Sequence, residues 1–249
     1  MTGATTMYRT ISAEVTKART HPAMLYTVLA ALLIPPALSV AMGLGPAGNP
    51  QTITDLHSQG FEVAGFGQPL VILLAAVIAG SEYQNGLLRS SQLATPNRTR
   101  LLAAKTILIS GAVFGLAIVS IGLAVILRHM VLGDAGLAVT EFTPGMWLNL
   151  LTVGINWTLI SLIAAALTVL ARSILLPVIV LVPMVLGLGV ALVGVLPWLK
   201  YAPDLAGLQL ISTYPGLGLL DPLAGGLVMT AWAIGLLIPA FIAFNRRDT

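Results

Sequence analysis

Long apolar stretches alternate with short polar segments along almost the whole chain. The apolar stretches cover Ala23 to Met42, Gly65 to Ala79, Leu101 to Leu127, Met146 to Ala171, Ile174 to Leu196 and Leu223 to Phe244. A hydrocarbon core about 30 Å thick is crossed by roughly 20 apolar helical residues. Most of the stretches are long enough, and the residues from Phe61 to Ala64 complete the second. The pattern therefore predicts an all-α polytopic membrane protein with six transmembrane helices, in a single domain over residues 1–249.

The basic residues predict the orientation of these helices. Of the 12 Lys and Arg residues, all except Arg128 and Lys200 fall before the first span, in alternate loops or after the last span. The members of this group are Arg9, Lys17, Arg19, Arg89, Arg98, Arg100, Lys105, Arg172, Arg246 and Arg247. Cytoplasmic segments carry the Lys and Arg excess, so we expect both termini in the cytoplasm. The pI of about 9.5 then reflects topology, and we expect no nucleic acid partner.

Two segments outside the spans also have recognisable patterns. In residues 7–20, the apolar residues Tyr8, Ile11, Val15 and Ala18 recur at helical spacing, which predicts an amphipathic helix in the membrane interface. A cytoplasmic helix packed on protein is the alternative. Residues 197–222 are too polar and too rich in proline for a full span. We expect short helices at the outer surface there, or else a shallow re-entrant hairpin.

Two adjacent prolines, Pro35 and Pro36, lie in the middle of the first span. A proline inside a helix removes one backbone donor and bends the helix. We expect a kink there, and neighbouring helices must supply donors to the carbonyls that the prolines leave free.

The spans offer little that could carry chemistry. Every charged residue can be placed in a loop or at an interface, so no acid or base marks an ion pathway within a span. We expect no catalysis, no bound cofactor and no metal on this chain, because cysteine is absent and the three histidines lack ligand spacing. Asn149 and Asn156, with Trp157 beside the latter, share one face of the fourth span. That face is the candidate lining of a substrate path, although helix-to-helix hydrogen bonding is the more common role of such residues.

The chain also lacks a nucleotide-binding loop of the usual kind. Such a loop ends in Gly-Lys-Ser/Thr, and each of Lys17, Lys105 and Lys200 follows a residue other than Gly. If transport needs ATP, another polypeptide must hydrolyse it.

The longest predicted cytoplasmic loop covers residues 81–100, between the second and third spans. From residue 81 to residue 105 the sequence is SEYQNGLLRSSQLATPNRTRLLAAK. A short helix here would place Leu87, Leu88 and Leu93 along a surface that can enter a groove on a partner, with Arg89 beside it. A solvated connector with positive-inside charges is the alternative.

The order of residues in this loop resembles a known pattern. The pattern begins with an acid, a glycine and a hydrophobic pair. A proline followed closely by arginine comes next, and a lysine opens the third span. In this chain the matching stretch contains Glu82, Gly86, Leu87, Leu88, Arg89, Leu93, Pro96, Arg98 and Lys105. The residues 244–248, FNRRD, resemble the Phe-x-Arg-Arg-Asp finish that follows a sixth span. Together these motifs make the chain similar to type-2 ATP-binding-cassette (ABC) transporter permeases. The stretch LPWLKYAP at 196–203 resembles members from high-GC Gram-positive bacteria.

The resemblance implies a permease subunit of a bacterial cytoplasmic membrane that docks on two ABC ATPase subunits, where ATP and Mg²⁺ bind. It implies a second permease chain, either an identical copy or a paralogue, and a coupling helix in the 81–100 loop. The residues that would contact the ATPase are Glu82, Tyr83, Gly86, Leu87, Leu88, Arg89 and Leu93. We expect the complex to be an exporter that carries out efflux. Because the spans are so apolar, we expect an amphiphilic or hydrophobic cargo, such as a lipid, a hydrophobic peptide or an antibiotic.

Two other classes of protein fit the six spans. An ion-gradient-driven secondary transporter is disfavoured by the absence of repeated halves and of acids within the spans. The second class is a membrane scaffold or sensor subunit that transports nothing. Co-purification distinguishes them, because the permease should bring an ATPase with it.

Overall fold

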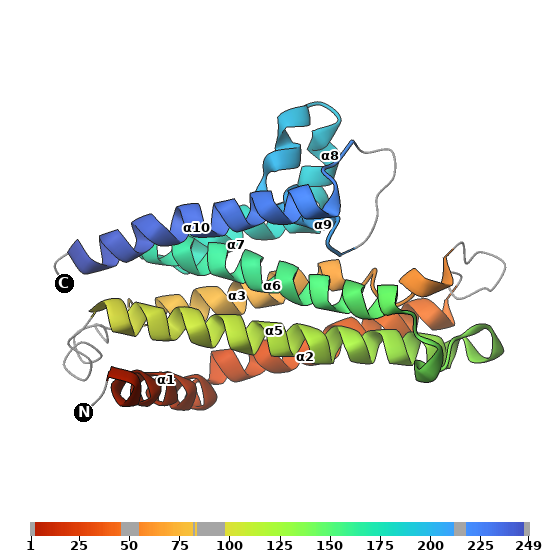
Figure 1. The fold of residues 1–249 in the computed structure, drawn as a ribbon, viewed down its shortest axis with the longest axis horizontal. Coiled ribbons are helices and arrows are strands. Elements are labelled where there is room, and N and C mark those ends of the chain that lie inside the picture. Colours follow the sequence, from red (N-terminus) through yellow and green to blue (C-terminus); the bar gives the residue numbers. More distant parts are fainter. Residues whose placement is uncertain (1–2, 46–54, 82, 84–97, 212–217, 247–249) are drawn as a thin grey trace.

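The computed structural model describes residues 3–45, 55–81, 83, 98–211 and 218–246. Within these ranges every regular element is helical. Figure 1 shows the long helices packed alongside one another in a bundle. The beginning of α1 and the end of α10 lie at the same end of this bundle.

The helices follow the predicted apolar stretches closely. The long ones are α1 (Gly3–Thr20), α2 (Pro22–Leu44), α3 (Ala64–Gly80), α5 (Arg98–Val131), α6 (Pro144–Ala171) and α10 (Pro222–Arg246). The segment between α6 and α10 contains α7 (Leu175–Pro183), the π-helix η6 (Met184–Leu188), α8 (Gly189–Val193), the 3₁₀-helix η7 (Pro197–Tyr201) and α9 (Pro203–Leu208). Three further 3₁₀ turns lie in connections, namely η3 (Leu56–Ser58), η4 (Gly133–Ala135) and η5 (Val139–Glu141).

Five helical stretches are long and apolar enough to cross a membrane. They are α2, α5, α6, the continuous stretch Leu175–Val193 and α10. The remaining predicted span, the second along the chain, corresponds to α3, which has 17 residues and is therefore only about 26 Å long. Phe61 was expected to extend this span, but it lies in a turn before α3. The Phe61 carbonyl there accepts a hydrogen bond from the Ala64 amide at 3.0 Å. The chain is thus a multi-pass membrane protein with five candidate spans and one shorter apolar helix.

The fifth predicted span, Ile174 to Leu196, is not one straight helix. Pro183 ends α7, and Gly187 has a φ of 118° inside the π-helical turn that follows. This conformation is readily available to glycine, and proline lacks the amide that would continue the helical ladder. In Figure 1 the chain beyond α7 turns away from the bundle and projects from its side before it returns as α9.

The residues before α10 form short helices, as one of the two sequence interpretations expected. However, α9 packs against α6 and α10. Its residues Asp204 to Gly207 are all buried. It is therefore inserted among the long helices instead of resting on their outer surface.

The prolines of α2 receive the partner that they require. Pro35 and Pro36 cannot donate to the carbonyls of Ala31 and Leu32, four residues earlier. The Ser120 hydroxyl of α5 donates to Ala31 O at 2.8 Å and lies 3.3 Å from Leu32 O. In return, the Ser39 hydroxyl of α2 donates to Ala124 O at 2.8 Å. These buried bonds join α2 to α5, and α2 is continuous from Pro22 to Leu44.

The amphipathic segment predicted over residues 7–20 is helical and forms most of α1. It packs on α5 and α2, and the side chains that it buries are Thr10 and Glu14. Tyr8, from the apolar stripe, is 74% exposed. The helix therefore contacts protein along an edge beside its apolar stripe, and part of that stripe is left uncovered.

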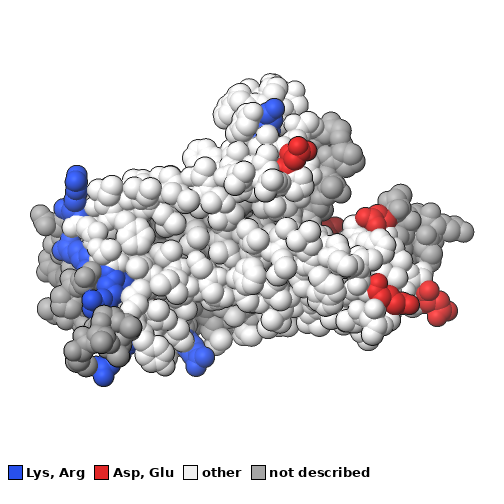
Figure 2. Space-filling model, viewed as in Figure 1, with Lys and Arg blue, Asp and Glu red and all other residues white. Residues whose placement is uncertain are grey.

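Charged residues separate along the long axis of the molecule. In Figure 2 most Lys and Arg side chains gather at the end where α1 begins, and Asp and Glu gather at the opposite end and on the projecting segment. The tight turn between α6 and α7 is at the basic end: Arg172 has a left-handed φ of 52° and caps α6. The segregation of charge seen in the sequence is thus also a feature of the surface.

We expect Ser120→Ala to lower the free energy of unfolding by about 1 kcal/mol, because the Ala31 carbonyl would lose its donor in a dry interior. Thermal or denaturant unfolding of the purified protein in detergent measures the loss. Ser110→Ala is the matched control, since Ser110 is on the same helix but donates within it, to Thr106 O at 2.9 Å. Equal losses in the two variants would contradict the interhelical role of Ser120.

Candidate functional site

Lys105, near the start of α5, forms a buried ion pair at the basic end. Its Nζ lies 2.7 Å from Oε2 of Glu14 in α1, and it also donates to the Ile78 carbonyl of α3 at 3.0 Å. The two side chains are 3% and 9% exposed. One ammonium group thus joins α1, α3 and α5, and we call Lys105, Glu14 and Ile78 the basic-end junction.

The basic-end junction stands at the base of the predicted coupling loop. The loop leaves α3 at Gly80 and enters α5 at Arg98. Most of the expected ATPase contacts, namely Glu82, Gly86, Leu87, Leu88, Arg89 and Leu93, lie outside the described residues. The exception is Tyr83, whose amide donates to Gly80 O at 3.0 Å and whose side chain packs on the core. The proposed contacts stay a prediction, and the structure describes how the two ends of their loop are held.

Asn156, one of the predicted path residues, lies in a buried polar contact between three helices. Gln68 Nε2 of α3 donates to Asn156 Oδ1 at 2.8 Å, and Asn156 Nδ2 donates to Gly207 O of α9 at 2.8 Å. Both amide side chains are buried. In the described conformation this asparagine connects α3, α6 and α9.

Trp157 continues the same contact toward α3. Its indole Nε1 donates to Ala64 O at 3.1 Å, in the first turn of α3, and its side chain is fully buried. The indole lies so close to Gly67 that a Cβ atom at that position would overlap it. Glycine is therefore required there for α3 to approach α6.

Asn149, the third predicted path residue, is about two turns away along α6 and is only partly buried. Its carbonyl accepts a hydrogen bond from the Thr152 hydroxyl at 2.8 Å. The structure thus brings Asn156 and Trp157 into one contact network and leaves Asn149 outside it. Gln68 belongs to this network and was not singled out from the sequence. An amide within an apolar stretch is the signal that could have indicated it, since such a group needs a partner in lipid.

Arg128 is inside the protein at the acidic end. Its Nε and Nη2 donate to Gln59 Oε1 at 3.0 and 2.8 Å, and its Nη2 lies 3.8 Å from Glu62 Oε1. The Arg128 side chain is 2% exposed. Arg128, one of the two basic residues outside the predicted cytoplasmic segments, is therefore a buried structural cation.

Asp204 is a buried acid in the segment between the fifth and sixth predicted spans. It is 5% exposed, and its carboxylate lies against the backbone of Gly189 in α8. Neither oxygen accepts a hydrogen bond of good geometry from the described residues. Burial raises the pKa of the Asp204 carboxyl above its ordinary value, and the nearby backbone amides of Leu205 and Asp204 only partly offset this effect.

Three charged residues that the sequence allows in loops or at interfaces are covered by protein. Lys105, Arg128 and Asp204 are buried in the protein. Sequence placed them at span ends or in loops, and it could not show that those positions would be covered by α1, by the segment before α3 and by α8. The argument against an ion-driven carrier, which relied on missing buried acids, is correspondingly weaker.

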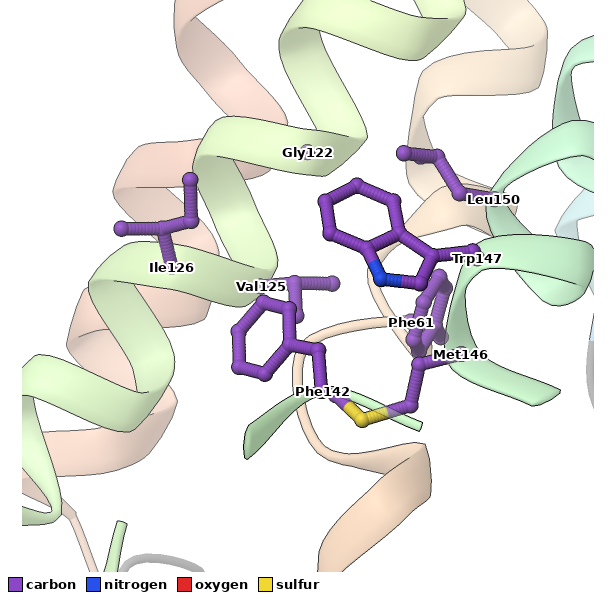
Figure 3. A pocket seen from close by; sticks show the side chains of 8 residues that line it. All are labelled: Phe61, Gly122, Val125, Ile126, Phe142, Met146, Trp147 and Leu150. Atoms are coloured by element: carbon purple, nitrogen blue, oxygen red, sulfur yellow. The ribbon is translucent and has the colours of Figure 1, made fainter. Parts of the chain in front are cut away.

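A small pocket lies between α5 and α6 near the acidic end. Figure 3 shows the aromatic side chains of Phe142 and Trp147 beside it, with Met146 and Leu150 of α6 and Val125 of α5 nearby. Its volume is about 30 Å³, whereas pockets for drug-sized ligands measure roughly 300–1,000 Å³. This pocket is therefore too small to hold an amphiphilic cargo in the described conformation. Among the described residues there is also no cluster of His, Asp and Glu that could hold a metal ion.

Five apolar helical stretches of membrane-spanning length define the chain as a multi-pass helical membrane protein. A family profile described as ABC-2 family transporter protein matches residues 10–189, more than half of the chain. The chain therefore belongs to the ABC-2 family and is a membrane subunit of an ABC transporter. Among curated proteins there is no significant match. The matched residues run from α1 to the first residue of α8 and include the predicted coupling loop.

We expect that removing one partner of the basic-end junction will be strongly destabilising. Lys105→Met should lower the free energy of unfolding by about 3 kcal/mol, because it leaves Glu14 charged and buried without its cation. The double variant Glu14→Leu with Lys105→Met should recover much of that loss, which a double-mutant cycle on unfolding in detergent would measure. Additive losses would contradict a direct pairing of the two side chains.

We also expect stability to depend on pH through Asp204. Because its pKa is raised in the folded protein, the free energy of unfolding should be highest below the ordinary pKa of 3.8 and should fall as pH rises through the raised value. Asp204→Asn should remove this decline and stabilise the protein at pH 8, because the amide carries no charge whose burial is costly. The control is Asp134→Asn at an exposed acid. A decline that persists in Asp204→Asn would contradict the assignment.

Proposed function

We propose that this chain is the membrane-spanning subunit of an ABC exporter in a bacterial cytoplasmic membrane. Two such chains, or one chain and a paralogue, would combine with two separate ATPase subunits that bind ATP and Mg²⁺. Membership of the ABC-2 family carries this proposal. The absence of a Gly-Lys-Ser/Thr loop supports the placement of ATP hydrolysis on another polypeptide.

The distribution of charge supports an orientation with both termini in the cytoplasm. Lys and Arg gather at the end of the bundle where α1 begins and α10 ends. Cytoplasmic segments are the ones enriched in these residues. The same end carries the loop between α3 and α5, so this orientation presents the proposed coupling segment to a soluble ATPase.

The proposal includes α3 as a sixth, short span. Most of α3 is buried, including Val71, Ile72, Leu74 and Ala75, so protein surrounds it more than lipid does. Irregular backbone at membrane depth is tolerated where protein covers it, and Phe61 and Val63 in the preceding turn are 2% and 0% exposed. A span shorter than the bilayer is physically acceptable under these conditions, because its outer end needs no lipid contact.

The basic-end junction supports a route for force from the ATPase into the membrane. When the ATPase pair closes on ATP, it would push on the 81–100 loop. One end of that loop continues into α3, and the other reaches Lys105, which holds α5 to α1 and α3 through Glu14 and Ile78. In this scheme α1, α3 and α5 move together at the cytoplasmic side.

The cargo is proposed to be a lipid, a hydrophobic peptide or an antibiotic. The apolar composition supports this class, since 57% of residues are hydrophobic and 8% are charged. Asn149, Asn156 and Trp157 remain the proposed polar lining of the path. Because Asn156 and Trp157 hold α3 and α9 to α6, opening a path along this face would require an exchange of the bonds to Gln68, Gly207 and Ala64.

Two measurements on the same complex test the proposal. Affinity purification of the chain from mild detergent should bring down an ATPase subunit in a one-to-one ratio. Charge reversal by Glu82→Arg or Arg89→Glu should then reduce ATPase stimulation or transport about tenfold or more, while membrane insertion is unchanged. Arg246→Glu, at the exposed end of α10, is the control and should have a smaller effect.

An active chain that purifies without any ATPase would refute the proposal. In that case the buried acid Asp204 would favour a carrier driven by protons, and transport by the isolated chain in liposomes under a pH gradient would show it. Normal coupling in both charge-reversal variants would refute the assignment of the 81–100 loop alone.

A further inference from the structure

A large apolar cavity opens where α1 meets α2, α3 and α5. Its volume is about 210 Å³, seven times that of the pocket near the acidic end. Val15 and Ala18 of the α1 stripe line it, together with Val28 of α2, Leu74 of α3 and Ala112 of α5. Two half-buried residues of the apolar stripe thus form one wall of a hollow between the helices.

Water is a poor occupant for this cavity. An ordered water needs two to four polar partners, and an apolar cavity of about 150 Å³ stays dry and takes up apolar molecules. Here the lining is apolar except for Arg19. Because α2 and α5 are candidate membrane spans, the neighbouring medium that can fill the hollow is the hydrocarbon of lipid. An acyl chain that enters from the bilayer exchanges apolar lipid neighbours for apolar side chains, so a chain segment fits the cavity chemically.

The rim of the cavity adds a specific charge. Arg19 lines it, is exposed, and belongs to the last turn of α1 together with Lys17. These residues are at the basic end of the bundle, at the level where α1 ends at Thr20 and α2 begins at Pro22. A basic residue at the mouth of an apolar hollow complements a molecule with an apolar chain and an anionic head.

We propose that this cavity binds one anionic phospholipid, with an acyl chain against Val15, Ala18, Val28 and Leu74 and its phosphate beside Arg19. The lipid would brace α1 against the bundle beside the basic-end junction, since Ile78 both lines the cavity and accepts the Lys105 hydrogen bond. The proposal needs the membrane-embedded fold and does not depend on the proposed transport activity.

The test compares phospholipid retention in purified full-length chains. The protein is extracted in mild detergent, supplied with phosphatidylglycerol or phosphatidylcholine, and analysed by native mass spectrometry for bound lipid and by thermal unfolding. We expect about one phosphatidylglycerol per chain, a higher unfolding temperature with that lipid, and weaker retention of phosphatidylcholine. Arg19→Gln should weaken phosphatidylglycerol binding about fivefold, the effect expected for one basic residue near an anionic headgroup.

Two matched controls separate charge from volume. Arg9→Gln removes an exposed basic residue of the same helix that does not line the cavity, and it should bind as the wild type does. Ala112→Phe fills the cavity from its exposed mouth and should abolish retention of both lipids, whereas Val119→Phe, at a position of α5 that is 58% exposed, should leave retention unchanged.

Three outcomes would overturn the inference. Equal binding of phosphatidylglycerol to Arg19→Gln and to the wild type would show that Arg19 does not bind the lipid headgroup. Wild-type retention in Ala112→Phe would show that lipid does not occupy the cavity. A change of oligomeric state in Ala112→Phe without a change in lipid content would show that a second copy of the chain covers this face instead.

Discussion

The bundle depends on one constraint, which is that polar groups within it must find their partners in the protein. Lipid offers neither donors nor acceptors, so an unpaired backbone or side-chain group in a span carries its full desolvation cost. The long helices meet this constraint with a few bonds between elements far apart in sequence. Ser120 bonds to α2, Asn156 to α9 and Lys105 to α1. Each of these residues serves more than one helix or carbonyl, which is why few polar residues suffice.

The course of the long helices could be predicted from the sequence because it depends on a one-dimensional property. An apolar stretch of about 20 residues has few alternatives to a membrane helix, and the termini of α2, α5, α6 and α10 fall within a few residues of the predicted ones. The need of Pro35 and Pro36 for an outside donor was equally predictable, because it follows from proline chemistry. The side chain that supplies this donor could not be predicted, because Ser120 is distant in sequence and resembles the other serines of the spans.

The structure differs from the sequence predictions where the packing of distant residues determines the local conformation. The close approach of α3 to α6 depends on Trp157, whose indole bonds to the Ala64 carbonyl and occupies the place where a side chain at Gly67 would lie. The break at Gly187 follows from a glycine conformation that composition does not reveal, because many glycines in this chain are ordinary helical residues. The burial of Asp204 depends on the return of α9 into the bundle. The proposed coupling residues could be chosen only by resemblance, since nothing in their physical chemistry distinguishes a docking helix from a solvated loop.

The reciprocal serine bonds between α2 and α5 limit how the transporter can change shape. Ser39 reaches from α2 to a carbonyl of α5, and Ser120 reaches from α5 to carbonyls of α2, so the bonded positions are seven or eight residues apart on α2 and four residues apart on α5. Sliding one helix past the other by even a single residue rise of about 1.5 Å would break both bonds at once. The two bonds therefore oppose sliding of α2 along α5. A movement that keeps both bonds has to occur where these two helices meet their other neighbours, which include α3, α6 and α10.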